Sequence, residues 1–166
     1  MTQRMPLAIE PTTAAVPPML AFVFELRIHV GVPLELGQVH QGRRRIIPIT
    51  GGTFEGPGLK GTILPGGADW QMLRGDGVAE IDARYTLQTD TGQLIYIQNA
   101  GVRHAPPDVM RRLLAGESVN PELVYFRTAP TFETSAPELQ DLTRAIYVAS
   151  GERHPTEVVI RVWRVS

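Results

Sequence analysis

The chain has 166 residues, 43% of them hydrophobic and 20% charged, which suffices for one packed domain and excludes extensive disorder. Its formal net charge of −1 excludes a general electrostatic attraction to nucleic acid or to anionic membranes. The absence of cysteine excludes disulfides, a thiolate nucleophile and cysteine-ligated metal centres. The 16 glycines and 14 prolines favour many short strands joined by turns.

Residues 1–18 predict an extended arm ahead of a single domain of residues 19–166, because four prolines break any periodic pattern in the arm. Pro6, Glu10 and Pro11 interrupt any hydrophobic region of a signal peptide. No apolar run is long enough to cross a bilayer. We therefore expect a cytoplasmic protein that has neither a membrane nor a nucleic acid as its partner.

Alternation of apolar and polar residues with a period of two predicts the strands. It is clearest in Phe22–Val30 and in Val78–Thr89, which the turn Asp90-Thr91-Gly92 joins to Leu94–Gln98 as a hairpin. Residues 31–41 contain two glycines and a proline and are predicted to form a loop. Further strands are expected at Leu59–Leu64, Leu123–Thr128, Ala145–Ala149 and Val158–Val165. This pattern predicts an all-β protein with a single antiparallel β-barrel, lipocalin-like in shape.

One short helix is predicted at Ala105–Gly116, where Pro106 and Pro107 suit the first turn and Gly116 suits the C-terminal cap. It is too short to form a domain, so we expect it to act as a plug or lid on the sheet. Ser135–Leu142 has the spacing of a capping box and is predicted to begin a short helical turn.

The stretch Gly42–Gln71 carries most of the sequence's distinctive motifs. Gly42–Pro57 follows the pattern G-x-R-x-x-x-P-I-x-G-G-x-F-x-G-P, and Leu59–Gln71 reads L-x-G-x-I-L-P-G-G-A-D-W-Q. With Tyr85–Asp90 and Tyr125–Thr128, these motifs resemble the family of small bacterial and fungal proteins called domain of unknown function 3237, the UPF0311 type. The resemblance spans about residues 20–165. It implies a single antiparallel β-barrel that is often oligomeric, and it implies no particular activity.

Several common kinds of site are disfavoured by the residues themselves. Gly56–Gly61 matches G-x-G-x-x-G, but Pro57 removes an amide and a strand follows, whereas a dinucleotide site needs a helix there. The four histidines are scattered without ligand spacing. We therefore expect neither a metal nor another cofactor. Arg43-Arg44-Arg45 is interpreted as a surface run with one arginine, Arg45, turned inward to contact a ligand.

Asp69 and Trp70 form the first candidate pair. Adjacent strand residues point to opposite faces, so only one of the two easily lines a lumen. Either Asp69 caps the turn after Gly66-Gly67 while Trp70 lies in the core, or Asp69 is a functional carboxylate.

Tyr125, Arg127 and Glu133 form the second constellation. Tyr125 and Arg127 share one strand face, and an arginine inside a barrel must be paired or must bind an anion. Either Arg127 and Glu133 form a buried structural pair, or Arg127 holds an anionic ligand while a carboxylate acts as a base. The resulting hypothesis is a lumen site with catalytic and ligand-binding residues. The catalytic candidates are Asp69, Glu133 and Tyr85, and the ligand-binding candidates are Arg127, Trp70, Phe54, Arg45 and Asn99.

Three functions remain open: a binding barrel for a small, partly apolar, anionic or aromatic metabolite, a cofactor-independent acid–base enzyme using the same lumen, and a structural role. A closed apolar interior would favour the structural role, and Arg127 paired with Glu133 in an open lumen would favour binding. A carboxylate with a raised pKa facing the lumen would favour catalysis. Apolar residues on both faces of Val158–Val165 also predict a homo-oligomer.

Overall fold

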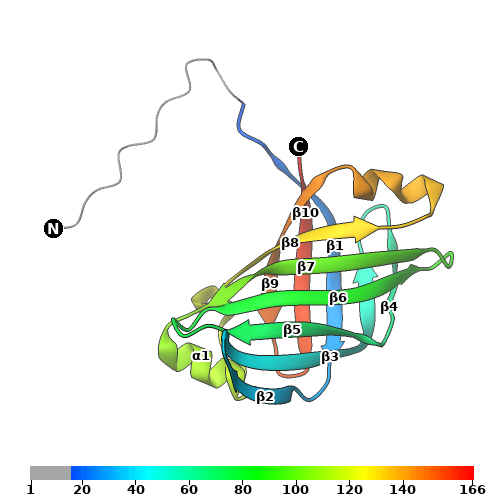
Figure 1. The fold of residues 1–166 in the computed structure, drawn as a ribbon. Coiled ribbons are helices and arrows are strands. Elements are labelled where there is room, and N and C mark those ends of the chain that lie inside the picture. Colours follow the sequence, from blue (N-terminus) through cyan, green and yellow to red (C-terminus); the bar gives the residue numbers. More distant parts are fainter. Residues whose placement is uncertain (1–15) are drawn as a thin grey trace.

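The computed structural model describes residues 16–166, and ten strands of this part form one antiparallel sheet that closes into a barrel of eight strands with two extra strands (Figure 1). The predicted all-β, antiparallel barrel is therefore confirmed. The strands are β1 (Leu20–Val30), β2 (Leu34–Val39), β3 (Gly42–Glu55), β4 (Lys60–Ile63), β5 (Gly67–Leu73), β6 (Ala79–Thr89), β7 (Leu94–His104), β8 (Tyr125–Glu133), β9 (Ile146–Arg153) and β10 (Glu157–Val165).

The long strand β3 closes the barrel. Along one edge, the first part of β3 pairs with β2 and its last part pairs with β1. Along the other edge, the first part pairs with β5 and the last part pairs with β4. Strand β1 also pairs with β10, and the remaining strands continue in the order β10-β9-β8-β7-β6 back to β4 and β5. Gly52 is needed at this closure, because a Cβ there would lie 2.1 Å from the Arg27 carbonyl oxygen and the backbone φ is +139°.

The α-helix α1 (Pro107–Leu114) lies at one end of the barrel (Figure 1), two residues shorter at each end than predicted. It buries Val109, Met110 and Leu113, so the apolar stripe of the helix faces the barrel. Two 3₁₀ segments, η1 (Pro121–Leu123) and η2 (Pro137–Thr143), complete the helical structure of residues 16–166. The capping box predicted at Ser135 is wrong, because the N-cap of η2 is Ala136, whose side chain accepts no hydrogen bond.

The two ends of the barrel interior differ in chemistry. The end away from α1 is filled by an aromatic cluster in which the Phe24 ring lies 5.6 Å from that of Phe54 and 5.8 Å from that of Phe132. Leu26, Leu87, Ile95, Ile97 and Val162 are buried around this cluster with essentially no exposed surface. The apolar core therefore seals one end, and polar groups lie in the other half.

Several segments differ from the sequence-based prediction, among them β8, which continues to Glu133, five residues past its predicted end. The predicted loop at residues 31–41 contains β2, which tolerates Gly37 because the pairing with β3 shifts register between Glu35 and Gly37. Strand β7 continues to His104, and β9 continues to Arg153, each well past the predicted end. Most of the arm predicted at residues 1–18 lies outside the described residues.

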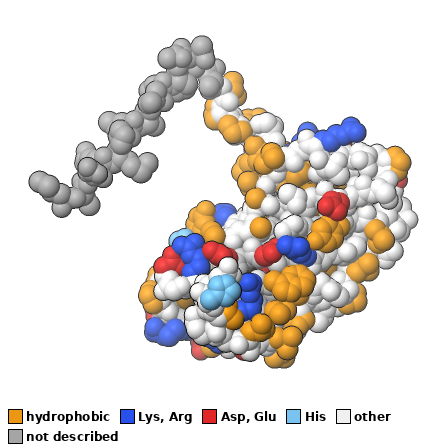
Figure 2. Space-filling view, viewed as in Figure 1, with side chains coloured by type: hydrophobic (Ala, Val, Ile, Leu, Met, Phe, Trp, Pro, Cys, Tyr) orange, Lys and Arg blue, Asp and Glu red, His pale blue; other side chains and the backbone are white. Residues whose placement is uncertain are grey.

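The outer surface mixes apolar and charged side chains (Figure 2). Phe22 is 45% exposed and meets Trp163 edge-to-face, with the ring centroids 6.3 Å apart. Beside this pair, Arg161 bridges Glu25 and Glu152 across β1, β10 and β9. No helix within residues 16–166 is long and apolar enough to span a membrane.

Candidate functional site

A small cavity of about 40 Å³ lies inside the barrel and shares lining residues with a hollow beside the C-terminal end of α1. Most of its wall is aliphatic, from isoleucine and valine side chains of β1, β3, β6 and β10, with the ring of Phe126 on β8. Five polar side chains also line it: Asp69, Tyr85, Asn99, Arg103 and Arg153. Small-molecule sites have this mostly apolar lining with a few converging polar groups, but they are usually larger, at roughly 300 Å³ or more.

The strand register brings Asp69 and Asn99 to the same level of the barrel wall. Asp69 on β5 is opposite Ala83 on β6, and Ala83 is opposite Asn99 on β7. Directly opposed residues of an antiparallel sheet point to the same face, so Asp69 and Asn99 face the lumen together, separated by the small Ala83. Tyr85, two residues along β6, faces the lumen as well.

Asp69 is held in place through both of its carboxylate oxygens. The backbone N–H of Asp82 donates to Oδ1 at 3.0 Å, and Nε2 of Gln71 donates to Oδ2 at 3.2 Å. Burial raises the pKa of Asp69 from its usual value of 3.8 to about 6, although these hydrogen bonds and the charge of Arg103 act in the opposite direction. Asp69 therefore exchanges a proton close to neutral pH.

Tyr85 and Asn99 are buried beside Asp69 with unused hydrogen-bonding capacity. Tyr85 is 2% exposed and Asn99 is also 2% exposed. The Tyr85 hydroxyl and Asn99 Oδ1 have no hydrogen-bond partner among residues 16–166. Burial and the nearby Asp69 charge raise the pKa of Tyr85, so its hydroxyl stays protonated and acts as a donor. Gly67 permits this placement, because a Cβ there would lie 2.6 Å from the Tyr85 Cβ.

Arg103 on β7 is the most unusual group in the cavity. It is 3% exposed, its Nε has no partner in the described chain, and its guanidinium carbon lies 5.6 Å from the centre of the Phe126 ring. Burial lowers the pKa of Arg103 to about 10, while the Asp69 charge opposes this shift and the charges of Arg153 and Arg45 add to it. Arg103 is therefore a cation at neutral pH in a largely dehydrated position.

The cavity continues into a larger hollow at the end of the barrel, which we call the vestibule. The vestibule has a volume of about 480 Å³ and shares Arg103, Arg153, Val30 and Ile47 with the inner cavity. Its rim is formed by residues 31–33, by residues 155–156 and by the C-terminal end of α1 at residues 113–116. The vestibule and the inner cavity therefore share part of their walls, and α1 forms one side of the vestibule.

Arg45 lies in the vestibule on β3 and is already paired. It is 6% exposed, and its Nε donates to Glu35 Oε1 at 2.8 Å, while Arg43 binds the other oxygen of the same carboxylate at 3.0 Å. The predicted inward position of Arg45 agrees with this placement, but Arg45 lines the vestibule instead of the inner cavity.

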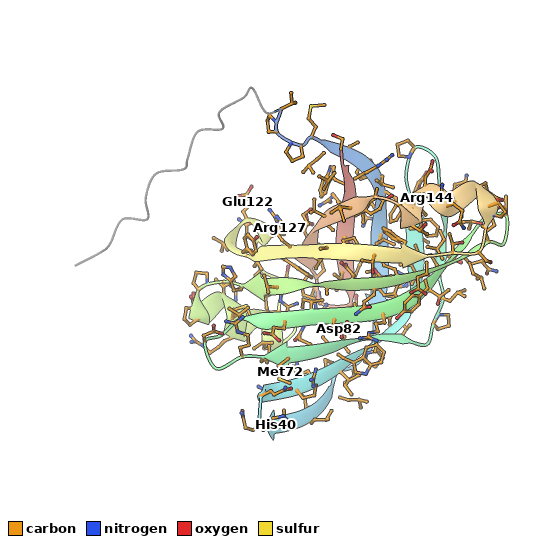
Figure 3. The ribbon with its side chains drawn as sticks, turned by 45° about the horizontal axis from the view of Figure 1, so that its top comes forward. His40, Met72, Asp82, Glu122, Arg127 and Arg144 are labelled. Atoms are coloured by element: carbon orange, nitrogen blue, oxygen red, sulfur yellow. The ribbon has the colours of Figure 1, made fainter. Side chains whose placement is uncertain are left out.

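The prediction that Arg127 and Glu133 face the lumen is wrong. Burial along β8 alternates strictly, with odd-numbered residues exposed and even-numbered residues buried. Arg127 lies on the outer side (Figure 3), where it donates to the Phe126 carbonyl oxygen at 2.9 Å and covers the Tyr125 ring. Glu133 is exposed on the same outer face, so neither the proposed Arg127–Glu133 pair nor a base role for Glu133 in the lumen is possible.

Trp70 and Phe54 do not line the cavity either. Trp70 follows Asp69 on β5, points outward and is 38% exposed. Phe54 is 2% exposed and belongs to the aromatic cluster at the far end of the barrel. Of the predicted site residues, the structure therefore brings Asp69, Tyr85 and Asn99 together, with Arg45 at the entrance.

Arg103 and Arg153 are the site residues that sequence reasoning missed. The predicted strand ends at Gln98, but the alternation in Ile95, Ile97, Asn99 and Arg103 continues on the inward face. Arg153 lies outside the predicted strands, although it is the last residue of β9. Following the period-two pattern past Gly101 would have placed Arg103 in the lumen. Among residues 16–166, no three histidine, aspartate or glutamate side chains gather as metal ligands.

The fold and its cavity define a small antiparallel β-barrel with a half-buried carboxylate and a buried arginine in its lumen. Residues 18–165 match the family model described as "Protein of unknown function (DUF3237)", so the chain belongs to that family. A UPF0311 protein of Rhodopseudomonas palustris is 42% identical over 144 residues, which cover 87% of this chain and 94% of the relative. The crystal structure of a conserved protein from the same species has a TM-score of 0.87 at 39% identity, covering 92% of this chain and 100% of that one.

A more distant similarity is to an enzyme. The hydroalkoxylation enzyme phnH of Penicillium herquei is 31% identical over 81 residues, which cover 49% of this chain and 54% of that protein. The crystal structure of an enzyme from the same fungus has a TM-score of 0.70 at 20% identity, covering 94% of this chain and 100% of that one. This second likeness shows a common fold.

Proposed function

We propose that this barrel is a cofactor-independent enzyme that moves a proton on a small, partly apolar molecule bound in its lumen, with Asp69 as the general acid–base. The observation that carries the proposal is the position and pKa of Asp69, a carboxylate that faces the lumen and titrates at about 6. A carboxylate near this pKa has both protonation states available at neutral pH, which general acid–base catalysis requires.

The neighbouring polar groups support this role. The Tyr85 hydroxyl has no partner in the described structure and is a donor for an oxygen atom of the substrate. Asn99 Oδ1, equally unpartnered among these residues, is an acceptor for a substrate hydroxyl. The Arg103 charge stabilises negative charge that develops when Asp69 removes a proton. Gln71 Oε1 is also unpartnered, so a turn of its amide lets it accept the proton of neutral Asp69.

Hydroalkoxylation, the activity in the name of the fungal relative, fits this arrangement chemically. In such a reaction an O–H bond adds across a carbon–carbon double bond. The hydroxyl oxygen forms a C–O bond, its proton leaves to a base, and the second alkene carbon gains a proton. No electrons are gained or lost overall, so a single carboxyl group that accepts one proton and returns one is sufficient.

Binding without turnover is the second candidate. The buried Arg103 favours it, because a dehydrated guanidinium needs an anionic partner whether or not a reaction follows.

Deuterium uptake from D₂O tests the proposal even when the product of the reaction has not been identified. Purified protein is incubated in D₂O with a library of unsaturated alcohols, phenols and β-keto acids, and carbon-bound deuterium is measured by mass spectrometry. We expect at least one compound to gain deuterium with the wild type, with a rate that changes around pH 6, and to gain none with Asp69→Asn. Equal uptake with the Asp69→Asn variant would contradict the proposal.

A further inference from the structure

We infer that the natural ligand carries a single carboxylate group, which Arg103 and Arg153 bind where the vestibule meets the inner cavity. This inference deepens the proposed function, on which it rests for the assumption that the ligand enters the lumen. It adds the ligand's charge and its orientation.

Arg103 is buried without the partner that a guanidinium needs. Its side chain is 3% exposed, its Nε has no hydrogen-bond partner within residues 16–166, and no carboxylate of that part of the chain forms an ion pair with it. It packs against the Phe126 ring, and a cation–π contact replaces only a small part of lost hydration. A guanidinium has five N–H donors in a planar fork that matches the two oxygens of a carboxylate. An anionic ligand therefore supplies the hydrogen-bond acceptors and the negative charge that Arg103 lacks.

The balance of charge around the entrance favours a monoanion. Arg45 donates directly to Glu35, which also lines the vestibule and also binds the exposed Arg43. Arg153 is half-buried, donates to the carbonyl oxygen of His154 and has no carboxylate partner among the described residues. Arg103 and Arg153 thus contribute two positive charges, and Asp69 contributes one negative charge when ionised. Among the charged side chains that line the two hollows, Arg45, Arg103 and Arg153 oppose Glu35 and ionised Asp69. One positive charge of this set is left over, so a monoanion neutralises it whereas a dianion would overcompensate it.

The side chains along the path inward set the orientation of the ligand. Arg153 and Arg103 line both the vestibule and the inner cavity, so they mark the boundary between the two. Ile28, Ile49 and Ile160 line the inner cavity together with Asp69 and Tyr85. A molecule with a carboxylate at one end and a short apolar body therefore binds with its head at the arginines. Its body points toward Asp69, and the small inner cavity limits the length of that body.

Calorimetric titration with isovalerate, its uncharged amide isovaleramide and isobutylphosphonate tests this assignment. The titration is done at a pH above the second pKa of the phosphonate, so that isobutylphosphonate is a dianion. The proteins are the wild type, Arg103→Met, Arg153→Met and, as a matched control on the outer face of the barrel, Arg127→Met. We expect the wild type and Arg127→Met to bind isovalerate with equal affinity and to bind isovaleramide at least tenfold more weakly. Arg103→Met should lose at least tenfold in isovalerate affinity, with a smaller loss for Arg153→Met.

Several outcomes would overturn the inference. One is that the wild type fails to bind isovalerate, and another is that both Arg103→Met and Arg153→Met bind isovalerate as the wild type does. Tighter binding of isobutylphosphonate than of isovalerate to the wild type would also overturn the inference. Because Arg153 is only half-buried, its variant keeps the test decisive if Arg103→Met fails to fold. Asp69→Asn separates the two proposals: it should retain isovalerate binding while losing deuterium exchange. If the protein does not prefer the carboxylate but deuterium exchange still depends on Asp69, the anion site is refuted and the proposed function is not.

Discussion

Replacing Asp69 with asparagine should make the protein more stable at neutral pH, which is the opposite of the usual effect of changing a buried residue. Burial is the largest cause of the raised pKa, so the folded protein disfavours the ionised carboxylate. The pKa rises from 3.8 to about 6 on folding, a difference of about two units. At about 1.4 kcal/mol per unit, ionised Asp69 costs the folded state about 3 kcal/mol.

The pH dependence follows from the direction of this shift. Because the folded pKa lies above the unfolded value, Asp69 contributes its full stability below about pH 4 and loses it as the pH rises through 6. Asparagine has the same shape and no charge at any pH. Its Oδ1 still accepts from the Asp82 N–H, and its amide can donate to the unpartnered Gln71 Oε1. The advantage of Asp69→Asn should therefore grow from near zero at about pH 4 to at most about 3 kcal/mol at about pH 8.

Urea denaturation at several pH values between about 4 and 8 measures this difference. The matched control is Asp82→Asn, since Asp82 lies on the outer face of β6 (Figure 3), where Arg84 and Gln98 donate to its carboxylate. An exposed pair of this kind is worth less than about 1 kcal/mol. If Asp69→Asn is no more stable than the wild type at about pH 8, or if its advantage does not grow with pH, the buried-carboxylate reasoning is refuted.

Further predictions concern the outer face, the barrel closure and assembly. Arg127→Ala should change the free energy of unfolding by less than about 0.5 kcal/mol, and a larger loss in urea denaturation would contradict its surface position. Gly52→Ala should lower the free energy of unfolding by at least about 2 kcal/mol in the same measurement. Its control, Gly58→Ala, should be nearly neutral because a Cβ there meets nothing within 4 Å, and equal effects of the two substitutions would refute the close-approach argument. We also predict a homo-oligomer that buries the exposed Phe22 and its neighbour Trp163, so Trp163→Glu should lower the mass measured by light scattering. A wild-type monomer at micromolar concentration would contradict this prediction.

The period-two patterns predict most of the fold. The predicted ends of strands β1, β6 and β10 lie within two residues of the observed ones, because each strand has apolar residues on a face that must be buried. The same rule separates Asp69 from Trp70, since adjacent residues of a strand cannot both face the lumen. Family motifs draw attention to Asp69, and the structure places its carboxylate in the cavity.

Alternation alone, however, divides a strand into two faces without saying which face is inside. In β8, Tyr125 and Arg127 alternate with Phe126 and Thr128, so both faces mix polar and aromatic residues. Only the pairing of β8 with β7, which sets Phe126 opposite the inward Arg103, decides that Arg127 is outside. The prediction for β7 stops at Gln98, before the small residues Ala100 and Gly101, and so omits Arg103.

The sequence by itself therefore determined an all-β barrel, a helix at its end and the rule that only one of Asp69 and Trp70 faces the lumen. Tertiary structure alone decided which charges share the cavity, because Asp69, Asn99, Arg103 and Arg153 come from strands β5, β7 and β9, brought together by barrel closure. It also decided the pKa of Asp69, since the burial that raises it comes from the surrounding barrel and not from the residues adjacent in sequence. Local sequence dictates which side chains a strand presents, whereas their chemistry depends on what the closed barrel places around them.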